Sequence, residues 1–411
     1  MDGFLTEASA WLDDHAERVS RDDELAWEKG EFSVAVFHAL PDDDERALLE
    51  RLKGWTQVKA QRGYHAVSAP REYGGLGLPA EYAWAYADLE RHYSQPASHE
   101  THSVTTRLIA PTIIAFGDEA QRARFVADFL SARELCCQLF SEPGAGSDLA
   151  GLACRATRDG DEWVVNGQKV WSSGARFAEW GELITRTDPD VVKHTGLTAF
   201  IIPMDLPGIE IRPIKQMSGG ASFNEVFFSD VRVADSMRLG GVGDGWRVAL
   251  TTLGFERDKS SGPRAGRVGG SWRQLLATAR AMGVTEDPVT RQQLAIAYTH
   301  ARIETYVNQR AADVRHPDAA PGPEGSVGKL LWTNGMTLYS DVVSRILGPA
   351  LVADTGAWGT YGWGEHVLGA PGYRIAGGSD EVQRNIIGER LLGLPPEPRS
   401  DKHVPWKDVP R

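Results

Sequence analysis

The chain has 411 residues, which is longer than one compact core usually organises, so we expect two or three domains. With 42% hydrophobic and 24% charged residues, the sequence can bury a sizeable core and lacks the composition of a disordered chain. The formal net charge of -12 excludes the broad positive field on which non-specific nucleic-acid binding depends. A polyanionic ligand would therefore need a local cationic pocket.

Membrane-spanning and secretory segments are not expected. The longest apolar stretches, 108–116 and 197–204, are shorter than the roughly 20 residues that a membrane-spanning helix needs. The acidic N-terminus lacks the basic and apolar regions of a secretory signal, and Cys136, Cys137 and Cys154 form neither a disulfide framework nor a zinc pattern. We therefore expect a cytoplasmic protein with no metal site and no membrane insertion.

Helical periodicity dominates both ends of the chain. We expect an N-terminal helical domain over residues 1–132, with helices at 45–61 and 119–132. A second helical domain is expected over 241–395, followed by a surface or disordered tail over 396–411. The predicted helices of this second domain, which suit an antiparallel bundle, are 246–258, 271–283, 291–314, 326–347 and 379–393.

Residues 133–240 have the pattern of a β domain. Asn166 and Gly167 lie between two β-prone runs, which predicts a hairpin turn. Further strands are expected at 197–204, 208–214 and 224–234. The predicted order is therefore helical, then β, then helical.

The segment SEPGAGSDLAG, residues 141–151, is rich in glycine but is not a dinucleotide fingerprint. That fingerprint needs glycine where this sequence has Leu149, and it must open a helix. Gly144 and Gly146 would instead let the backbone approach a planar heterocycle closely. Polar groups in the same loop come from Ser141, Ser147 and Asp148.

Four segments resemble the successive signatures of the acyl-CoA dehydrogenase family: CQLFSEPGAGSDLAG, VNGQKVWSSGA, FNEVFFSDVRV and IAGGSDEVQRNIIGERLLGLP. The resemblance runs in order from the SAPREYGGLGLP segment to Leu394. It implies an α+β fold with an N-terminal helical domain, a central β-barrel domain and a C-terminal four-helix bundle. It also implies FAD as cofactor, an acyl-CoA substrate that is oxidised to the 2,3-enoyl-CoA, and electron-transfer flavoprotein as acceptor.

The resemblance places the flavin of FAD between the β domain and the bundle. Gln138, Leu139 and Ser141 would line the pyrimidine and N5 side of the ring. Trp171 would pack on the ring, and Ser173 would hydrogen-bond near N5, which becomes basic on reduction. Further cofactor contacts are implied for Gly146, Ser147, Arg345, Ser379 and Glu381. Ser379 is also predicted to be a helix N-cap.

Catalysis in this family needs a carboxylate across the substrate from the flavin, to remove the α proton. One known position for it is occupied here by Gly377, and the other by Glu256. At about 100° per residue, Glu256 lies roughly 20° from the edge of an apolar stripe, where burial would raise its pKa. That stripe consists of Trp246, Ala249, Leu250 and Leu253. Without the resemblance, a glutamate on the helix flank that bonds to Arg257 or Lys259 would be the simpler interpretation.

Further substrate contacts are implied around the same two positions. The backbone N–H of Gly377 would stabilise the thioester oxygen as it gains negative charge. Contacts with the substrate are also implied for Ser147, Arg257 and Gly378.

The sequence departs from homotetrameric family members in the segment that reaches the FAD pyrophosphate of a neighbouring subunit. Arg345 replaces a glutamine there and Pro349 replaces a glycine. This pattern is similar to the mixed two-subunit dehydrogenases that act on bulky side chains such as those of steroids. We therefore expect an oligomer, a dimer or tetramer, and both a homo-oligomer and a hetero-oligomer remain open.

Two alternative functions share the same fold. One is a flavin-dependent monooxygenase or oxidase, in which O2 takes the electrons; a monooxygenase would not need a base at Glu256. A non-catalytic partner subunit of a hetero-oligomeric dehydrogenase would not need to keep Glu256, Trp171 and the glycine-rich loop together. These features favour the dehydrogenase.

Overall fold

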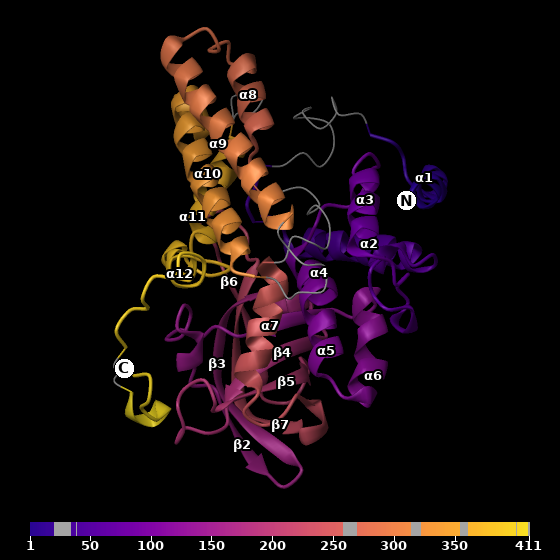
Figure 1. Cartoon of the computed structure of the whole chain (residues 1–411), viewed down its shortest axis with the longest axis vertical. Helices are drawn as coiled ribbons and strands as arrows, with labels where there is room; N and C mark the ends of the chain where they lie inside the picture. The colour runs from indigo at the N-terminus through magenta and orange to yellow at the C-terminus, as the bar shows by residue number, and fades with distance from the viewer. Residues whose placement is uncertain are drawn as a thin grey trace.

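The computed structural model describes residues 1–19, 34–37, 39–257, 269–313, 322–353, 361–399 and 401–409. Helices, a sheet and more helices follow one another along the chain, in the predicted order (Figure 1). Within these residues no helix is both long and apolar enough to cross a bilayer.

The N-terminal part is helical, as predicted. Its helices are α1 (Asp2–His15), α2 (Asp42–Ala60), α3 (Ala80–Glu90), α4 (Glu100–Val104), α5 (Ala110–Phe116) and α6 (Glu119–Leu130). A π-helical turn, Thr105–Ile109, joins α4 directly to α5. Helix α6 begins with a capping box, in which the Asp118 carboxylate accepts from the Gln121 amide at 2.8 Å.

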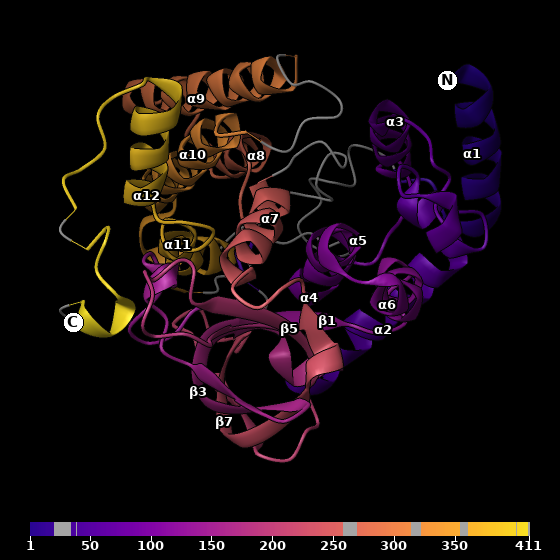
Figure 2. The ribbon, with the colours of Figure 1, turned by 60° about the horizontal axis from the view of Figure 1, so that its bottom comes forward.

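The central part is a curved sheet (Figure 2). Its strands are β1 (Cys136–Leu139), β2 (Arg155–Asp159), β3 (Glu162–Ser173), β4 (Trp180–Arg186), β5 (Leu197–Pro203), β6 (Ile209–Ile214), β7 (Phe223–Ala234) and β8 (Arg238–Leu239). They pair in the order β6-β7-β3-β2-β4-β5-β8, and β1 pairs in parallel with β4. The expected barrel is open in the described residues, because its end strands, β6 and β8, do not pair with each other. Strand β8 has only two residues, and Pro213 in β6 has no amide to donate.

The hairpin turn predicted at Asn166 and Gly167 is wrong. Strand β3 continues through both residues, and its turn with β2 lies at Gly160, where φ is +64°. The Asn166 side-chain amide donates to the Asp230 carboxylate at 3.0 Å, and the register of β3 against β7 shifts at Gly167. A Cβ on Gly167 would meet the Cys154 Cα at 2.7 Å. The Asn-Gly pair therefore lies opposite a β-bulge in β7, at a close approach of two backbone segments.

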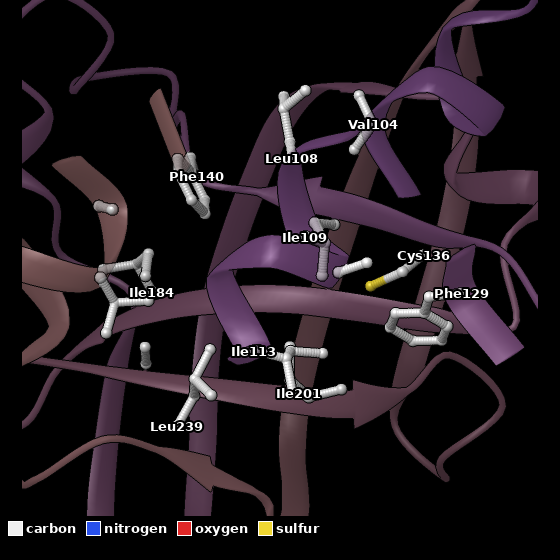
Figure 3. Packing of buried hydrophobic residues seen from close by; sticks show 14 of the residues in the cluster. Val104, Leu108, Ile109, Ile113, Phe129, Cys136, Phe140, Ile184, Ile201 and Leu239 are labelled. Carbon is white, nitrogen blue, oxygen red and sulfur yellow. The ribbon is translucent and has the colours of Figure 1, made fainter. Parts of the chain in front are cut away.

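One buried cluster joins the N-terminal helices to the sheet. Ile109 and Ile113 pack with Ile184 of β4 and Ile201 of β5, and all four side chains are fully buried (Figure 3). Burying an isoleucine contributes about 1.5–3 kcal/mol. This joint cluster ties the N-terminal helices to the sheet, alongside a cluster within the N-terminal helices and another within the sheet.

The C-terminal helices divide into two groups. They are α7 (Gly245–Arg257), α8 (Trp272–Ala281), α9 (Pro288–Asp313), α10 (Glu324–Leu347), α11 (Gly362–Tyr373) and α12 (Asp380–Ile386). Helices α8 to α11 form the expected bundle around α10, and α12 packs on α10 (Figure 1). Helix α7 instead lies against β5 and α5, where Val248 and Ala249 enter the shared core.

Helix α11 escaped prediction because its sequence, GWGEHVLGAPGY, contains several glycines and Pro371, which disfavour helix. Tertiary contacts stabilise it. The Trp363 side chain is fully buried and donates from Nε1 to the Thr278 hydroxyl at 2.8 Å. A Cβ on Gly270 would meet the Trp363 ring at 2.2 Å. Position 270, just before α8, must therefore be glycine to leave room for the ring.

Candidate active site

The glycine-rich loop is tied down at its two ends. Glu142 is buried and receives the Lys169 ammonium at 2.7 Å, where Lys169 is itself fully buried. The same carboxylate accepts from the amides of Ala153 at 2.6 Å and Cys154 at 2.9 Å. The sequence analysis singled out neither charged residue, although Lys169 is a lone charge in a β-prone run. The pair anchors the loop to β3.

The middle of the loop is open. A Cβ on Gly144 or Gly146 would meet nothing within 4 Å. Ser147 in the same loop is exposed. The loop therefore has room for a ligand to approach its backbone, and the contacts of Gly146 and Ser147 with the cofactor stay predictions.

The loop lies beside the end of β3, which carries two of the predicted flavin contacts. The Val170 amide donates to the Ser141 carbonyl at 2.9 Å, so Ser141 lies next to Trp171. Trp171 has a left-handed φ of +62°, and 58% of its surface is exposed. A large aromatic side chain that is strained and exposed points to a ligand that covers it. Ser173 ends the same strand.

Two residues of β1 differ in what they offer a flavin. The Gln138 Nε2 is buried and has no hydrogen-bond partner among the described residues, so a ligand acceptor could satisfy it. The Leu139 side chain is fully buried in the core of the sheet, and a Cβ on Gly181 would meet it at 2.4 Å. Leu139 can therefore contact a flavin only through its backbone. The unpartnered Gln138 Nε2 and the exposed Trp171 ring are each suited to contact with the flavin of FAD.

A ladder of aromatic rings connects this strand end to the C-terminal helices. Trp171 packs edge-on against Phe223 with ring centroids 5.8 Å apart, and Phe223 meets Phe37 at 5.1 Å. Phe37 stacks on Tyr373 at 5.1 Å, and Tyr373 ends α11. The ladder therefore brings the end of β3 toward the loop between α11 and α12.

That loop contains the two predicted glycines in left-handed conformations. Gly377 has φ of +66° and Gly378 has φ of +86°. The buried Gln383 side chain donates to the carbonyls of both glycines, at 3.0 and 3.2 Å. Ser379 caps α12 by accepting from the Val382 amide at 3.3 Å, which confirms the predicted N-cap. Glu381 lies in the first turn of α12, with a largely exposed side chain.

Asp380, which the sequence did not reveal, fixes this loop to the bundle. Its buried carboxylate accepts from Thr333 at 2.8 Å and pairs with Lys329 at 3.2 Å and Arg374 at 3.0 Å. Burial would raise the pKa of Asp380, but the hydrogen bonds from Arg374, Thr333 and Lys329 lower it below its ordinary value.

Helix α7 buries most of the predicted apolar stripe, Ala249 fully and Trp246 and Leu253 in part. Leu250, placed in the apolar stripe, is exposed, whereas Thr252 is fully buried. The Thr252 hydroxyl donates to Glu182 at 2.8 Å and lies 3.0 Å from the Thr112 hydroxyl of α5. Burial raises the pKa of Glu182 to about 8, and the bond from Thr252 opposes the rise. Hydrogen bonding to this carboxyl explains why a threonine faces inward.

The predicted base lies one turn further along the same helix. Position 256 follows Thr252 by four residues, and residues at this spacing share one face of a helix. The side chains of Glu256 and Arg257 lie outside the described residues.

Arg345 does not join the other predicted cofactor residues. It is exposed in the last turn of α10. Thr333, which contacts the α11–α12 loop, lies 12 residues earlier on the same helix, or about 18 Å at 1.5 Å per residue. Any phosphate that Arg345 contacts would be bound at a different place from the flavin ring.

Known proteins resemble the chain along nearly its whole length. Three family descriptions match: acyl-CoA dehydrogenase N-terminal domain over 34–133, middle domain over 137–231 and C-terminal domain over 243–392. The chain is 36% identical over 370 residues to acyl-CoA dehydrogenase IpdE1 of Mycobacterium tuberculosis, covering 90% of this chain and 94% of the relative. It is 29% identical over 301 residues, 71% of each chain, to the human mitochondrial short-chain specific acyl-CoA dehydrogenase.

Among solved structures, the steroid acyl-CoA dehydrogenase Tcur3481-Tcur3483 matches with a TM-score of 0.75 and 27% identity, covering 96% of this chain and 98% of the other. This agreement extends over all three parts of the fold described above. The chain belongs to the acyl-CoA dehydrogenase family of FAD-dependent oxidoreductases.

Proposed function

We propose that this chain oxidises an acyl-CoA thioester to the 2,3-enoyl-CoA, with Glu256 as the base that removes the α proton. When bound, FAD supplies the acceptor for the hydride that leaves the β carbon. Trp171 and Ser141 at the end of β3 and the start of the glycine-rich loop would bind the ring. Ser173 would donate to it, and Gln138 would hydrogen-bond its polar edge.

The observation that carries this proposal is the placement of α7. Its inner face is fixed by the bond between Thr252 and Glu182, and position 256 continues that face by one turn. The alternative base position is Gly377, whose left-handed φ favours glycine over any residue with a side chain. A carboxylate at the first position and none at the second favour Glu256. The Gly377 amide would then stabilise the developing negative charge on the thioester oxygen.

The test is flavin reduction by a panel of acyl-CoAs with straight, branched and steroid-linked acyl groups. Glu256→Gln is expected to retain FAD and to slow this reduction by about 10²–10⁴-fold, the usual contribution of a positioned general base. Glu119→Gln, an exposed carboxylate in α6, is the matched control and should leave the rate unchanged. Near-normal reduction in the Glu256 variant would remove Glu256 from the mechanism.

We propose further that the chain assembles with a second, related subunit and passes its electrons to an electron-transfer flavoprotein. Two observations support the assembly: Trp171 is largely exposed, and Arg345 lies away from the rest of the site. The similar Tcur3481-Tcur3483 enzyme carries two subunit names.

Expressed alone, the chain is expected to hold little FAD, and co-expression with the related subunit is expected to restore it. Absorbance of the bound flavin and the mass of the assembly measure both. A homomer saturated with FAD would contradict the mixed assembly. Electron-transfer flavoprotein should accept electrons from the reduced complex, and a complex that only an artificial acceptor can reoxidise would contradict the choice of acceptor.

A further inference from the structure

The C-terminal tail returns to the sheet after leaving α12 (Figure 1). Pro405 forms a β-bridge with Val192 in the loop between β4 and β5. The Trp406 amide donates to the Val191 carbonyl at 2.8 Å. The tail is thus a docked segment, with contacts to one particular place on the sheet.

Trp406 contacts the C-terminal end of the glycine-rich loop. Its Nε1 donates to the Gly151 carbonyl at 3.1 Å. Its ring packs against the Arg186 guanidinium, whose carbon lies 4.7 Å from the ring centroid. Arg186 is buried and donates to the Ala150 carbonyl at 2.6 Å. Trp406 therefore contacts this end of the loop directly and also covers the arginine that holds it.

Lys193 makes a second connection between the tail and the loop. Its ammonium lies 2.8 Å from an Asp148 carboxylate oxygen and 2.7 Å from one of Asp401 in the tail. The Lys193 side chain is almost fully buried, whereas Asp148 is 60% exposed and Asp401 is 19% exposed, so the pair with Asp401 is the better shielded of the two. Arg186 also donates to the Lys193 carbonyl at 2.6 Å, which joins the two connections.

We propose that tail residues 401–408 form a clamp that fixes the segment Asp148–Leu152, and through it the glycine-rich loop, in its ligand-binding conformation. Trp406, Lys193 and Arg186 are the positioning residues of this clamp. The inference rests on the proposed function, because it takes FAD to bind over the glycine-rich loop. A loop ordered before binding loses less conformational entropy when the ligand arrives, so the clamp should increase FAD affinity.

The test uses the full-length chain in the assembly that binds FAD. Trp406→Ala is expected to speed hydrogen exchange at the amides of residues 148–153 without FAD, and to raise the FAD dissociation constant about tenfold. Lys193→Met and a chain ending at Pro395 should act in the same direction. Lys407→Ala is the matched control, because Lys407 is in the same tail but pairs with the exposed Asp190 instead of the loop.

The two readouts separate this inference from the proposed function. Unchanged exchange in both Trp406→Ala and the shortened chain would overturn the clamp. Faster hydrogen exchange with unchanged FAD affinity would also overturn the proposal, because the clamp would then not contribute to FAD binding. If Trp171→Ala likewise left FAD affinity unchanged, the proposed flavin position itself would fail. If Trp171→Ala weakened FAD binding but Trp406→Ala did not, the result would support the proposed flavin position and contradict the clamp.

Discussion

At the scale of single residues, Glu182 is unusual because it is a fully buried carboxyl with no basic partner among the described residues. The register of β1 against β4 pairs it with Gln138, so the two side chains lie on the same face of the sheet. Each has a buried polar atom without a partner in the described residues: Oε2 of Glu182 and Nε2 of Gln138. Glu182 contacts Thr252 of α7, so this face of the sheet is the one that α7 covers.

The raised pKa of Glu182 predicts a pH dependence. Its folded-state pKa of about 8 lies above the ordinary value near 4.3, so between these values the folded protein binds more protons than the unfolded one. The free energy of unfolding therefore falls as pH rises through this range. Glu182→Gln cannot titrate and should lose this dependence.

The measurement is the thermal midpoint of Glu182→Gln relative to the unsubstituted protein, from about pH 5 to about pH 8. We expect the difference to shift steadily in favour of the variant as pH rises. Glu119→Gln, at an exposed carboxylate of α6, is the control for the substitution itself. A constant difference for Glu182→Gln would mean that Glu182 is ionised in the folded protein.

At the scale of elements, the α11–α12 loop depends on its glycines. Gly378 is left-handed, and a Cβ there would meet the Gln383 Nε2 at 2.5 Å. Gly160, in the β2–β3 turn, is also left-handed, but a Cβ there would meet nothing within 4 Å. Alanine substitutions at these two glycines therefore separate the cost of a left-handed backbone from the cost of crowding around the new Cβ.

Both Gly160→Ala and Gly378→Ala should lose about 1–2 kcal/mol from the left-handed backbone. Only Gly378→Ala should lose about 1–3 kcal/mol more, because Gln383 must move from the carbonyls that it holds. Thermal or denaturant unfolding measures the two losses. Equal losses of unfolding free energy in the two variants would show that the Gln383 side chain moves aside without a free-energy cost.

At the scale of the whole molecule, a buried ion-pair cluster joins the N-terminal helices to the sheet. Glu45 of α2 receives His99 at 2.9 Å and Arg176, from the segment between β3 and β4, at 2.6 Å. Burial would raise the pKa of Glu45, but His99 and Arg176 together lower it below its ordinary value. Gly174 lies just beyond Ser173, and a Cβ there would meet the Thr101 hydroxyl at 1.7 Å. The cluster therefore supports the strand end proposed to bind flavin.

Glu45→Gln is expected to cost about 3 kcal/mol near neutral pH, because it removes the buried carboxylate from Arg176 and leaves that guanidinium only the exposed Asp42 as an ion-pair partner. Because the folded pKa of Glu45 is lowered, its stabilisation is present above the ordinary value and is lost as pH falls through the folded one. The cost should therefore shrink in acid. Unfolding at neutral and acidic pH measures it, with Glu50→Gln on the exposed face of α2 as control. A cost that did not change with pH would contradict the ion-pair explanation.

Local patterns sufficed for part of the site. The strands and the longest helices follow from periodicity, and Ser379 follows from capping chemistry. The turn predicted at Asn166-Gly167 was wrong because this dipeptide occurs both in hairpin turns and at bulged strand pairs. Contacts with residues distant in sequence, Cys154 and Asp230, distinguish the two here. Glu142 and Asp380 were missed because their partners, Lys169 and Lys329, are distant in sequence.

The sequence by itself determined the family, the order of the three parts and the identity of the residues available for chemistry, because motifs and periodicities are local properties of the chain. Only the tertiary structure decided which face of α7 is buried, how the rings from Trp171 to Tyr373 connect the sheet to the bundle, and that the tail docks beside the glycine-rich loop. Each of these depends on contacts between residues far apart in sequence, whose free energy arises only when burial and hydrogen bonding bring them together.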